Sequence, residues 1–196
     1  MKAGLRARYV EPNVTAPILA RLSFVHHHIM SLISRLRFSG AIVEVPMGAT
    51  QFVAFQHQII AIGTSELGSC SVVVIASEYG AILAHIPPRP PYPSNDRFAG
   101  DDNVRYMMAR VAQLFHQYGN FFPQPESVVV CAWYDGAVAL PDQLDIMTSS
   151  LRQIGLRSVI RTYHVPAGSF QGQGTVVAIR DGNQRRVQIY VEDRPL

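Results

Sequence analysis

The stretch SCSVVVIASEYGAILAHI, residues 69–86, decides which fold the chain can adopt. Ser71–Ala76 is a nearly continuous apolar run, which is typical of a strand buried on both faces. Glu78-Tyr79-Gly80 can form a turn, and Ala81–Ile86 is then expected to return as a second strand. The stretch therefore predicts a buried β-hairpin.

Apolar runs and alternating patterns predict six further strands around this hairpin. They cover residues 41–45, 51–62, 127–134, 159–165, 175–180 and 186–191. Pro46-Met47-Gly48 marks a turn between the first two, and Asp181-Gly182 marks a hairpin turn between the last two. Residues 87–100 contain five prolines and are expected to form a loop after the hairpin.

Two helices are predicted within this series of strands. The first is an apolar pattern at helical spacing that ends near Gly119, and Asp101 or Asp102 can cap its start. Pro141-Asp142 opens the second, and Gly155 ends it. The order β-β-β-β-α-β-α-β-β-β predicts an α+β domain, a layered α-β sandwich in which two main helices pack on mixed or antiparallel sheet layers.

Residues 1–40 differ in composition from residues 41–196, and we expect a basic N-terminal arm ahead of one folded domain. The arm carries six basic side chains and one acidic one, whereas the rest carries 11 basic and 13 acidic. Apolar residues recur at steps of mostly three and four, which predicts an amphipathic helix within residues 16–38. Such a helix can pack on its own domain, lie on a membrane surface or bind a partner protein.

The length, composition, charge and cysteine count of the chain exclude several classes of protein. The 196 residues, 48% hydrophobic and 16% charged, suffice for one domain with a real core. The near-neutral part after residue 40 is not expected to bind nucleic acid, which requires a basic surface. Two cysteines are too few for a disulfide-stapled secreted domain, and no apolar run reaches the roughly 18 residues that span a bilayer. We expect a cytoplasmic protein, or a mitochondrial one if the arginine-rich arm is a transit peptide.

The predicted hairpin brings a cysteine and a histidine together. Cys70 begins one strand and His85 ends the antiparallel one, so their side chains can meet. A catalytic cysteine needs such a base because the thiolate is the nucleophile. The preceding loop contains Gly63 and Gly68 and can aim backbone N–H groups at a substrate oxygen. Cys70 and His85 also fit structural roles, since a cysteine in a buried strand is commonly a small apolar residue.

Thr64 supplies a hydroxyl that can orient an imidazole, the role of the third member of a triad. The string Thr64-x-x-Leu67-Gly68-Ser69-Cys70, then a valine-rich strand, Ala84-His85 and a proline-rich exit, resembles the chemoreceptor glutamine deamidase family, CheD. Cytotoxic necrotizing factor toxins and protein N-terminal asparagine amidohydrolases are more distantly similar. The resemblance covers about residues 41–191. It implies a triad with Cys70 as nucleophile, His85 as base and Thr64 as third member.

The resemblance implies a cysteine-dependent amide hydrolase that deamidates Gln or Asn of a protein substrate through a thioester, with no metal or organic cofactor. Gly68 and Ser69 belong to the loop whose backbone N–H groups, near Ser69 and Cys70, are expected to stabilise the oxyanion. The sequence departs from the family at Trp133-Tyr134-Asp135-Gly136-Ala137, where the chain leaves the strand at 127–134. The first three of these residues leave the strand where a cleft often forms, so we predict that Trp133, Tyr134 and Asp135 contact substrate.

Two other classes of function stay open. The chain fits a non-catalytic domain of the same fold that binds a protein partner, or a membrane-surface protein recruited through residues 16–38. His26-His27-His28 has no partner at metal-ligand spacing, so no metal site is expected. Cys131 lies in an apolar run and is expected in the core.

Overall fold

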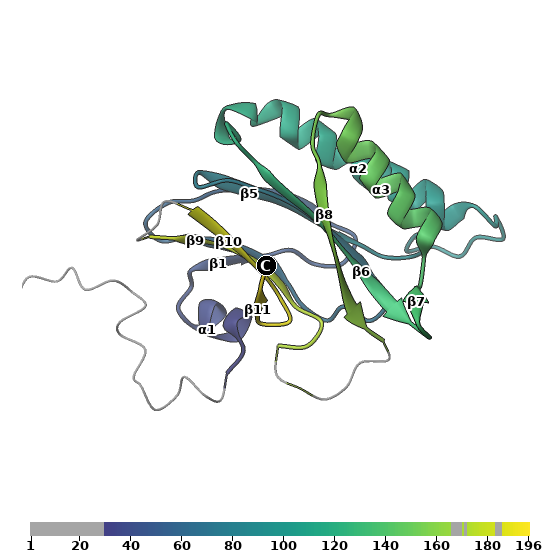
Figure 1. Ribbon diagram of the computed structural model, residues 1–196, viewed down its shortest axis with the longest axis horizontal. Coiled ribbons are helices and arrows are strands. Elements are labelled where there is room, and N and C mark those ends of the chain that lie inside the picture. The colour runs from purple at the N-terminus through teal and green to yellow at the C-terminus, as the bar shows by residue number, and fades with distance from the viewer. Residues whose placement is uncertain (1–29, 166–169, 171, 183–185) are drawn as a thin grey trace, which may run out of the picture.

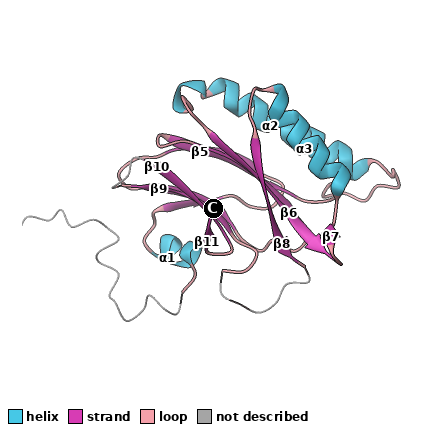
Figure 2. Cartoon of the chain, viewed as in Figure 1, coloured by secondary structure: helices cyan, strands magenta, loops and turns pink. Residues whose placement is uncertain are grey.

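In the computed structural model, residues 69–86 form the predicted hairpin in the interior of a sheet (Figures 1 and 2). Strand β4 (Ser71–Ala76) pairs antiparallel with β5 (Gly80–Ile86), with Ser71 opposite Ile86 and Ala76 opposite Ala81. Every residue of both strands is buried, as the apolar run predicts. The structure describes residues 30–165, 170, 172–182 and 186–196.

The hairpin belongs to a six-stranded sheet, called sheet B below. Strand β2 (Thr50–Ala54) pairs with β5, and β6 (Glu126–Tyr134) pairs with β4, both antiparallel. Strand β8 (Ser158–His164) pairs with β6 in parallel, and the short β7 (Ala137–Val138) pairs with the last two residues of β6.

A second, five-stranded sheet, called sheet A, packs against one face of sheet B. Its strands are, in spatial order, β1 (Ile42–Glu44), β3 (Ala61–Thr64), β9 (Val176–Asp181), β10 (Arg186–Val191) and β11 (Arg194–Pro195). β1 pairs with β3 in parallel, and the other pairs are antiparallel.

Helices α2 (Ala99–Gln117) and α3 (Pro141–Gln153) cover the opposite face of sheet B (Figure 1). A 3₁₀ turn, Gly119–Phe121, follows α2. One apolar core lies between the helices and sheet B, and another lies between the two sheets. The predicted α+β class, with sheet layers and two main helices packed on a sheet, is confirmed.

Helix α1 (Leu32–Phe38) packs on the outer face of sheet A, where its Ile33 and Leu36 are buried in a small third core. The last part of the predicted arm is therefore packed against the domain. The predicted helix over residues 16–38 is not continuous, because Ser31 is an extended N-cap and the helix begins only at Leu32. The part of that prediction over residues 16–29, and His26-His27-His28, lie outside the described residues.

The prediction of one strand over residues 51–62 is wrong. The run divides into β2 and β3, which lie in different sheets. The chain turns at the polar Gln56-His57-Gln58, where the Gln56 N–H donates to the Ile59 carbonyl at 2.8 Å. The predicted turn at residues 46–48 likewise carries the chain from β1 in sheet A to β2 in sheet B. The chain thus crosses between the sheets twice within a short span.

The start of α2 also differs from the prediction. The helix begins at Ala99, and Phe98 occupies the N-cap position without a side-chain hydrogen bond. Asp101 and Asp102 are not caps but lie in the first turn, where their negative charge stabilises the positive end of the helix dipole.

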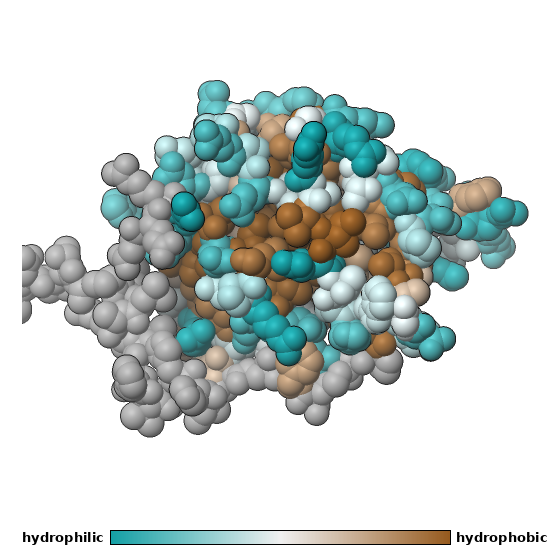
Figure 3. All heavy atoms as spheres, viewed as in Figure 1, coloured by the Kyte–Doolittle hydropathy of each residue, from teal (hydrophilic) through white to brown (hydrophobic). Residues whose placement is uncertain are grey.

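Apolar side chains gather across the middle of the face shown in Figure 3, where β8 crosses the view of Figure 1. Val159 and Ile160 of β8 are about half exposed. Among the helices that the structure describes, none is both long enough and apolar enough to cross a membrane.

Candidate active site

The two faces of the β4–β5 hairpin set the position of the site. Ile82, Ala84 and Ile86 of β5 face the helices, and Ala81 and Leu83 face sheet A. Because side chains alternate along a strand, His85 also projects toward sheet A. It lies directly opposite Val72, and Cys70 precedes Val72 by two residues in the core between the sheets. Cys70 does not begin the strand, as the sequence predicts, but lies one residue before β4. Its place in the core between the sheets puts it on the same side of sheet B as His85, and contact between the two side chains stays a prediction.

Thr64, at the end of β3 in sheet A, contacts His85 across the space between the sheets. The Thr64 Oγ1 lies 2.7 Å from His85 Nδ1 and 2.7 Å from the Val45 carbonyl oxygen. A carbonyl can only accept, so the single Thr64 hydroxyl proton goes to Val45, and Nδ1–H of His85 donates to Thr64. The proton of the neutral imidazole is thereby held on Nδ1, and Nε2 carries the lone pair. Thr64 and His85 are only 1% and 2% exposed.

His85 Nε2 is buried and has no hydrogen-bond partner among the described residues. It is therefore not hydrogen-bonded to Cys70 in this structure. Burial lowers the pKa of His85 below its ordinary value, and the Val45 carbonyl and the charge of Glu66 work against that lowering. The ring is thus held neutral, with a free lone pair in the protonation state that a general base requires.

The Cys70 side chain is 5% exposed. Burial raises the pKa of its thiol, and the backbone amide of Ser69 works against this rise. The thiol is therefore neutral at rest, unlike a cysteine that is activated in advance by a positive charge. The Tyr163 hydroxyl of β8 donates to the Cys70 carbonyl at 2.6 Å and fixes the backbone at this point.

The loop before Cys70 is braced from the outside by residues 172–174. The Leu67 N–H donates to the Gly174 carbonyl at 3.0 Å, and Gly174 N–H donates to a Glu192 carboxylate oxygen at 3.1 Å. Gly174 has a φ of +60°, and a Cβ there would come within 2.9 Å of the Leu67 backbone, so only glycine fits this approach. Gly68, by contrast, has open space around it, and Ser69 is exposed. The loop has room for a substrate beside Gly68 and Ser69.

A cleft of about 630 Å³ opens beside His85. It is lined by Arg37, Glu44, Val45, Pro46, Met47, Thr64, Ser65, Glu66 and His85. Two nitrogens of Arg37 donate to the two Glu44 carboxylate oxygens at 2.9 and 2.6 Å, and the Ser65 hydroxyl donates to Glu44 at 2.7 Å. The hydrogen bonds from Arg37 lower the pKa of Glu44.

Sequence reasoning missed this ion pair, and it missed the Val45 carbonyl and Tyr163. Arg37 comes from α1, which the sequence assigns to a separate arm, and Glu44 belongs to a three-residue strand. No local pattern links the two residues, because their contact depends on how α1 packs on sheet A.

The three predicted substrate contacts lie at the carboxyl end of β6, where Trp133 and Tyr134 are its last two residues and Asp135 follows them. The register of β4 and β6 brings this end beside Cys70. Trp133 pairs with Val138 and His164 in the sheet, Tyr134 is 57% exposed, and Asp135 turns the chain toward β7. None of the three lines the cleft beside His85. Their contact with substrate stays a prediction.

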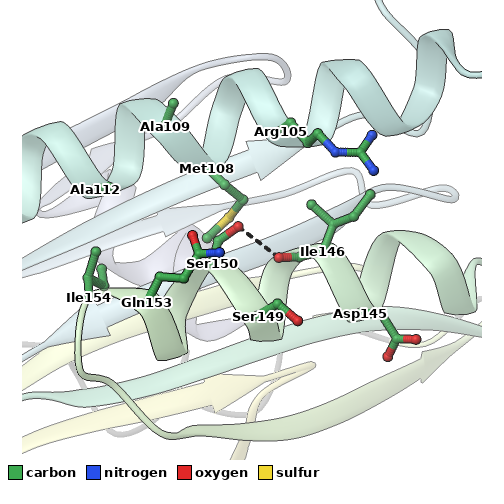
Figure 4. Close-up of a pocket in the computed structure, with 10 residues that line it drawn as sticks. All are labelled: Arg105, Met108, Ala109, Ala112, Asp145, Ile146, Ser149, Ser150, Gln153 and Ile154. Carbon is green, nitrogen blue, oxygen red and sulfur yellow. Dashed lines mark hydrogen bonds between the residues drawn. The ribbon is translucent and has the colours of Figure 1, made fainter.

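A second groove, between α2 and α3, offers no comparable chemistry. It measures about 490 Å³, and Figure 4 shows that its lining side chains come from the two helices. They include no cysteine or histidine, and the Ser150 hydroxyl donates to the Ile146 carbonyl of its own helix at 2.8 Å. A nucleophile paired with a base is therefore not available in this groove.

Cys131 lies in the core, as predicted, and its thiol is 3.7 Å from the Arg161 carbonyl oxygen. Both cysteines are free thiols. Within the described ranges, His, Cys, Asp and Glu side chains form no group of three or more that could hold a metal ion.

The chain matches no model of a known protein family, and it matches no curated protein sequence. A functional assignment therefore depends on the residues and geometry of the site itself.

Proposed function

We propose that the chain is a cysteine-dependent amide hydrolase that deamidates Gln or Asn side chains of a protein substrate. The observation that carries the proposal is the buried Thr64–His85 pair, which leaves a free Nε2 lone pair on the same sheet face as Cys70. This is the arrangement expected of a base and its orienting residue beside a nucleophile. The resemblance of residues 64–85 to the CheD family supports the same assignment.

The chemistry begins from a neutral thiol and a neutral imidazole. His85 Nε2 accepts the Cys70 proton as sulfur attacks the amide carbon, and backbone N–H groups near Ser69 and Cys70 stabilise the oxyanion. Protonated His85 then donates its proton to the departing ammonia, and water hydrolyses the thioester to a carboxylate and the free thiol. Nδ1–H continues to donate to Thr64 throughout. The sulfur and Nε2 approach each other when substrate binds, as catalytic contacts commonly tighten in the complex.

The raised pKa of Cys70 favours a second candidate, a non-catalytic domain of the same fold that binds a protein partner. The two candidates differ in whether Cys70 forms a covalent intermediate. A membrane-surface role through residues 16–38 and a cytoplasmic or mitochondrial location are further proposals from the sequence.

The test uses the full chain and a mixture of Gln- and Asn-containing peptides. We expect ammonia release and conversion of the peptide amide to a carboxylic acid, both seen by mass spectrometry and a coupled ammonia assay. Cys70→Ala should abolish both, whereas Cys131→Ala, which removes the other buried thiol, should retain them. Acid quenching should trap an acyl group on Cys70. Equal background release by all three proteins would overturn the proposal.

A further inference from the structure

The cleft beside His85 carries an unbalanced charge. Glu44, Glu66 and Arg37 are its charged lining residues, two carboxylates and one guanidinium. Arg37 and Glu44 pair through two hydrogen bonds, so their charges compensate each other. The Ser65 hydroxyl also donates to Glu44. Glu44 is therefore occupied by its protein partners, and the excess negative charge of the cleft belongs to Glu66.

Glu66 is free to meet a ligand. Its side chain is exposed and lines the cleft, and its charge acts on Arg37 and on His85. Glu66 stands only four positions before Cys70, in the loop that leads to the predicted nucleophile.

His85 gives independent reason to expect a ligand in this cleft. Its Nε2 is a buried polar atom without a partner among the described residues, and the residue lines the same cleft as Glu66. A buried acceptor without a hydrogen bond is costly, so a donor from a bound molecule satisfies it at a gain in free energy. The carboxamide N–H₂ of a substrate is such a donor.

The cleft is also open to a polypeptide rather than only to a small amide. Met47 is 66% exposed, and it lines both this cleft and a neighbouring one of about 740 Å³. The neighbouring cleft lies under the proline-rich loop and is lined by Tyr92 and Tyr106 among others. A chain that enters beside Glu66 can therefore continue across Met47.

We propose that this cleft selects polypeptide substrates that carry Lys or Arg next to the reactive Gln or Asn, with Glu66 as the specificity-determining residue. The proposal rests on the proposed function for the identity of the reactive group. Because Glu66 is exposed, the attraction between its carboxylate and the substrate cation is modest, and repulsion of a Glu at the same substrate position adds to the preference. Added salt weakens both interactions.

The experiment measures binding without turnover, on the full chain with Cys70→Ala. Fluorescein-labelled peptides, identical except for Lys, Ala or Glu beside a central Gln, are titrated by fluorescence anisotropy, and an Asn series is run in parallel. We expect the Lys peptide to bind about tenfold more tightly than the Glu peptide, a difference of about 1.4 kcal/mol. The preference should shrink as salt is added.

Two variants locate the source of the preference. Glu66→Gln keeps the side-chain shape and should make the Lys and Glu peptides bind with nearly equal affinity. Glu78→Gln makes the same charge change in the turn at the far end of the β4–β5 hairpin and should keep the preference. Equal binding of all peptides, absence of binding, or a preference that survives Glu66→Gln would each overturn the proposal.

A parallel ammonia assay on the Cys70 protein separates this proposal from the proposed function. A Lys preference in binding without ammonia release would support the specificity and overturn the hydrolase. Ammonia release at equal rates from the Lys and Glu peptides would support the hydrolase and overturn the specificity.

Discussion

The two faces of strand β5 differ in the elements that cover them and in the kind of contact made there. On one face, Ile82, Ala84 and Ile86 pack under α2 and α3 in a wholly apolar core. On the other, Ala81 and Leu83 face the apolar core between the sheets, and the series ends in His85, which contacts Thr64 beside an open cleft. The first face is held by burial alone, whereas the second ends in polar contacts between segments that are distant in sequence.

This difference decides what each face contributes. Apolar burial is non-directional and tolerates rearrangement, so it supplies stability. The Thr64–His85 contact depends on direction, since it fixes which imidazole nitrogen carries the proton. Mutations on the helix-covered face should therefore change stability most, and mutations at the open end should change reactivity more than stability.

The largest expected loss of stability is on the helix-covered face. Ile82→Ala removes a fully buried side chain from the core under α2 and should lower the free energy of unfolding by about 3 kcal/mol. Urea denaturation measures this change in the free energy of unfolding. Val159→Ala, on the half-exposed part of β8, is the control and should change stability by under about 0.5 kcal/mol. If Ile82→Ala stays folded but changes the reactivity of Cys70, the helix-covered face does not contribute stability alone.

Thr64→Val should reduce both stability and activity. The variant keeps the side-chain shape but leaves the Val45 carbonyl and His85 Nδ1 without their partner, at a cost of about 2 kcal/mol. Ammonia release should fall by about tenfold or more, because the imidazole proton is no longer held on Nδ1. Thr64→Ser restores the hydroxyl and should recover most of the activity. Full activity in Thr64→Val would mean that Thr64 does not orient the His85 imidazole for catalysis.

Tyr163→Phe should have a smaller effect. It removes the buried hydroxyl that donates to the Cys70 carbonyl and should cost about 1 kcal/mol in the free energy of unfolding. Tyr92→Phe, which alters an exposed hydroxyl in the proline-rich loop, is the matched control and should be neutral. If both variants are equally stable, the Tyr163 hydrogen bond does not fix the Cys70 backbone.

The pH dependence of stability gives the finest comparison. Because burial lowers the pKa of His85 below its ordinary value of 6.5, the unfolded chain binds this proton more readily than the folded one. The contribution of His85 is therefore fully present above about pH 6.5 and is lost as the pH falls below that value. Urea denaturation across this range should show that the free energy of unfolding falls less with decreasing pH in His85→Gln than in wild type. Identical losses would mean that His85 is not held neutral.

The sequence predicts the apolar framework better than the site. Ser71–Ala76 and Arg186–Val191 are strands at their predicted bounds, because a continuous apolar or alternating run carries its own signal. Residues 51–62 mislead because two apolar segments separated by a polar turn resemble one strand in a linear pattern. The pairing of Thr64 with His85 is found, but the Arg37–Glu44 pair depends on the packing of α1 and has no linear signal. The partnership of Cys70 with His85 stays a prediction.

The most direct test of that partnership is the rate of Cys70 alkylation by iodoacetamide, followed against pH in Cys131→Ala and in the same protein with His85→Gln. We expect His85, as a general base, to accelerate alkylation by about tenfold or more near pH 7. Because burial lowers the pKa of His85 below its ordinary value of 6.5, the acceleration should disappear as the pH falls below that value and His85 is protonated. Equal rates and the same pH profile in both proteins would contradict this expectation, because Cys70 would then be a buried thiol without a base.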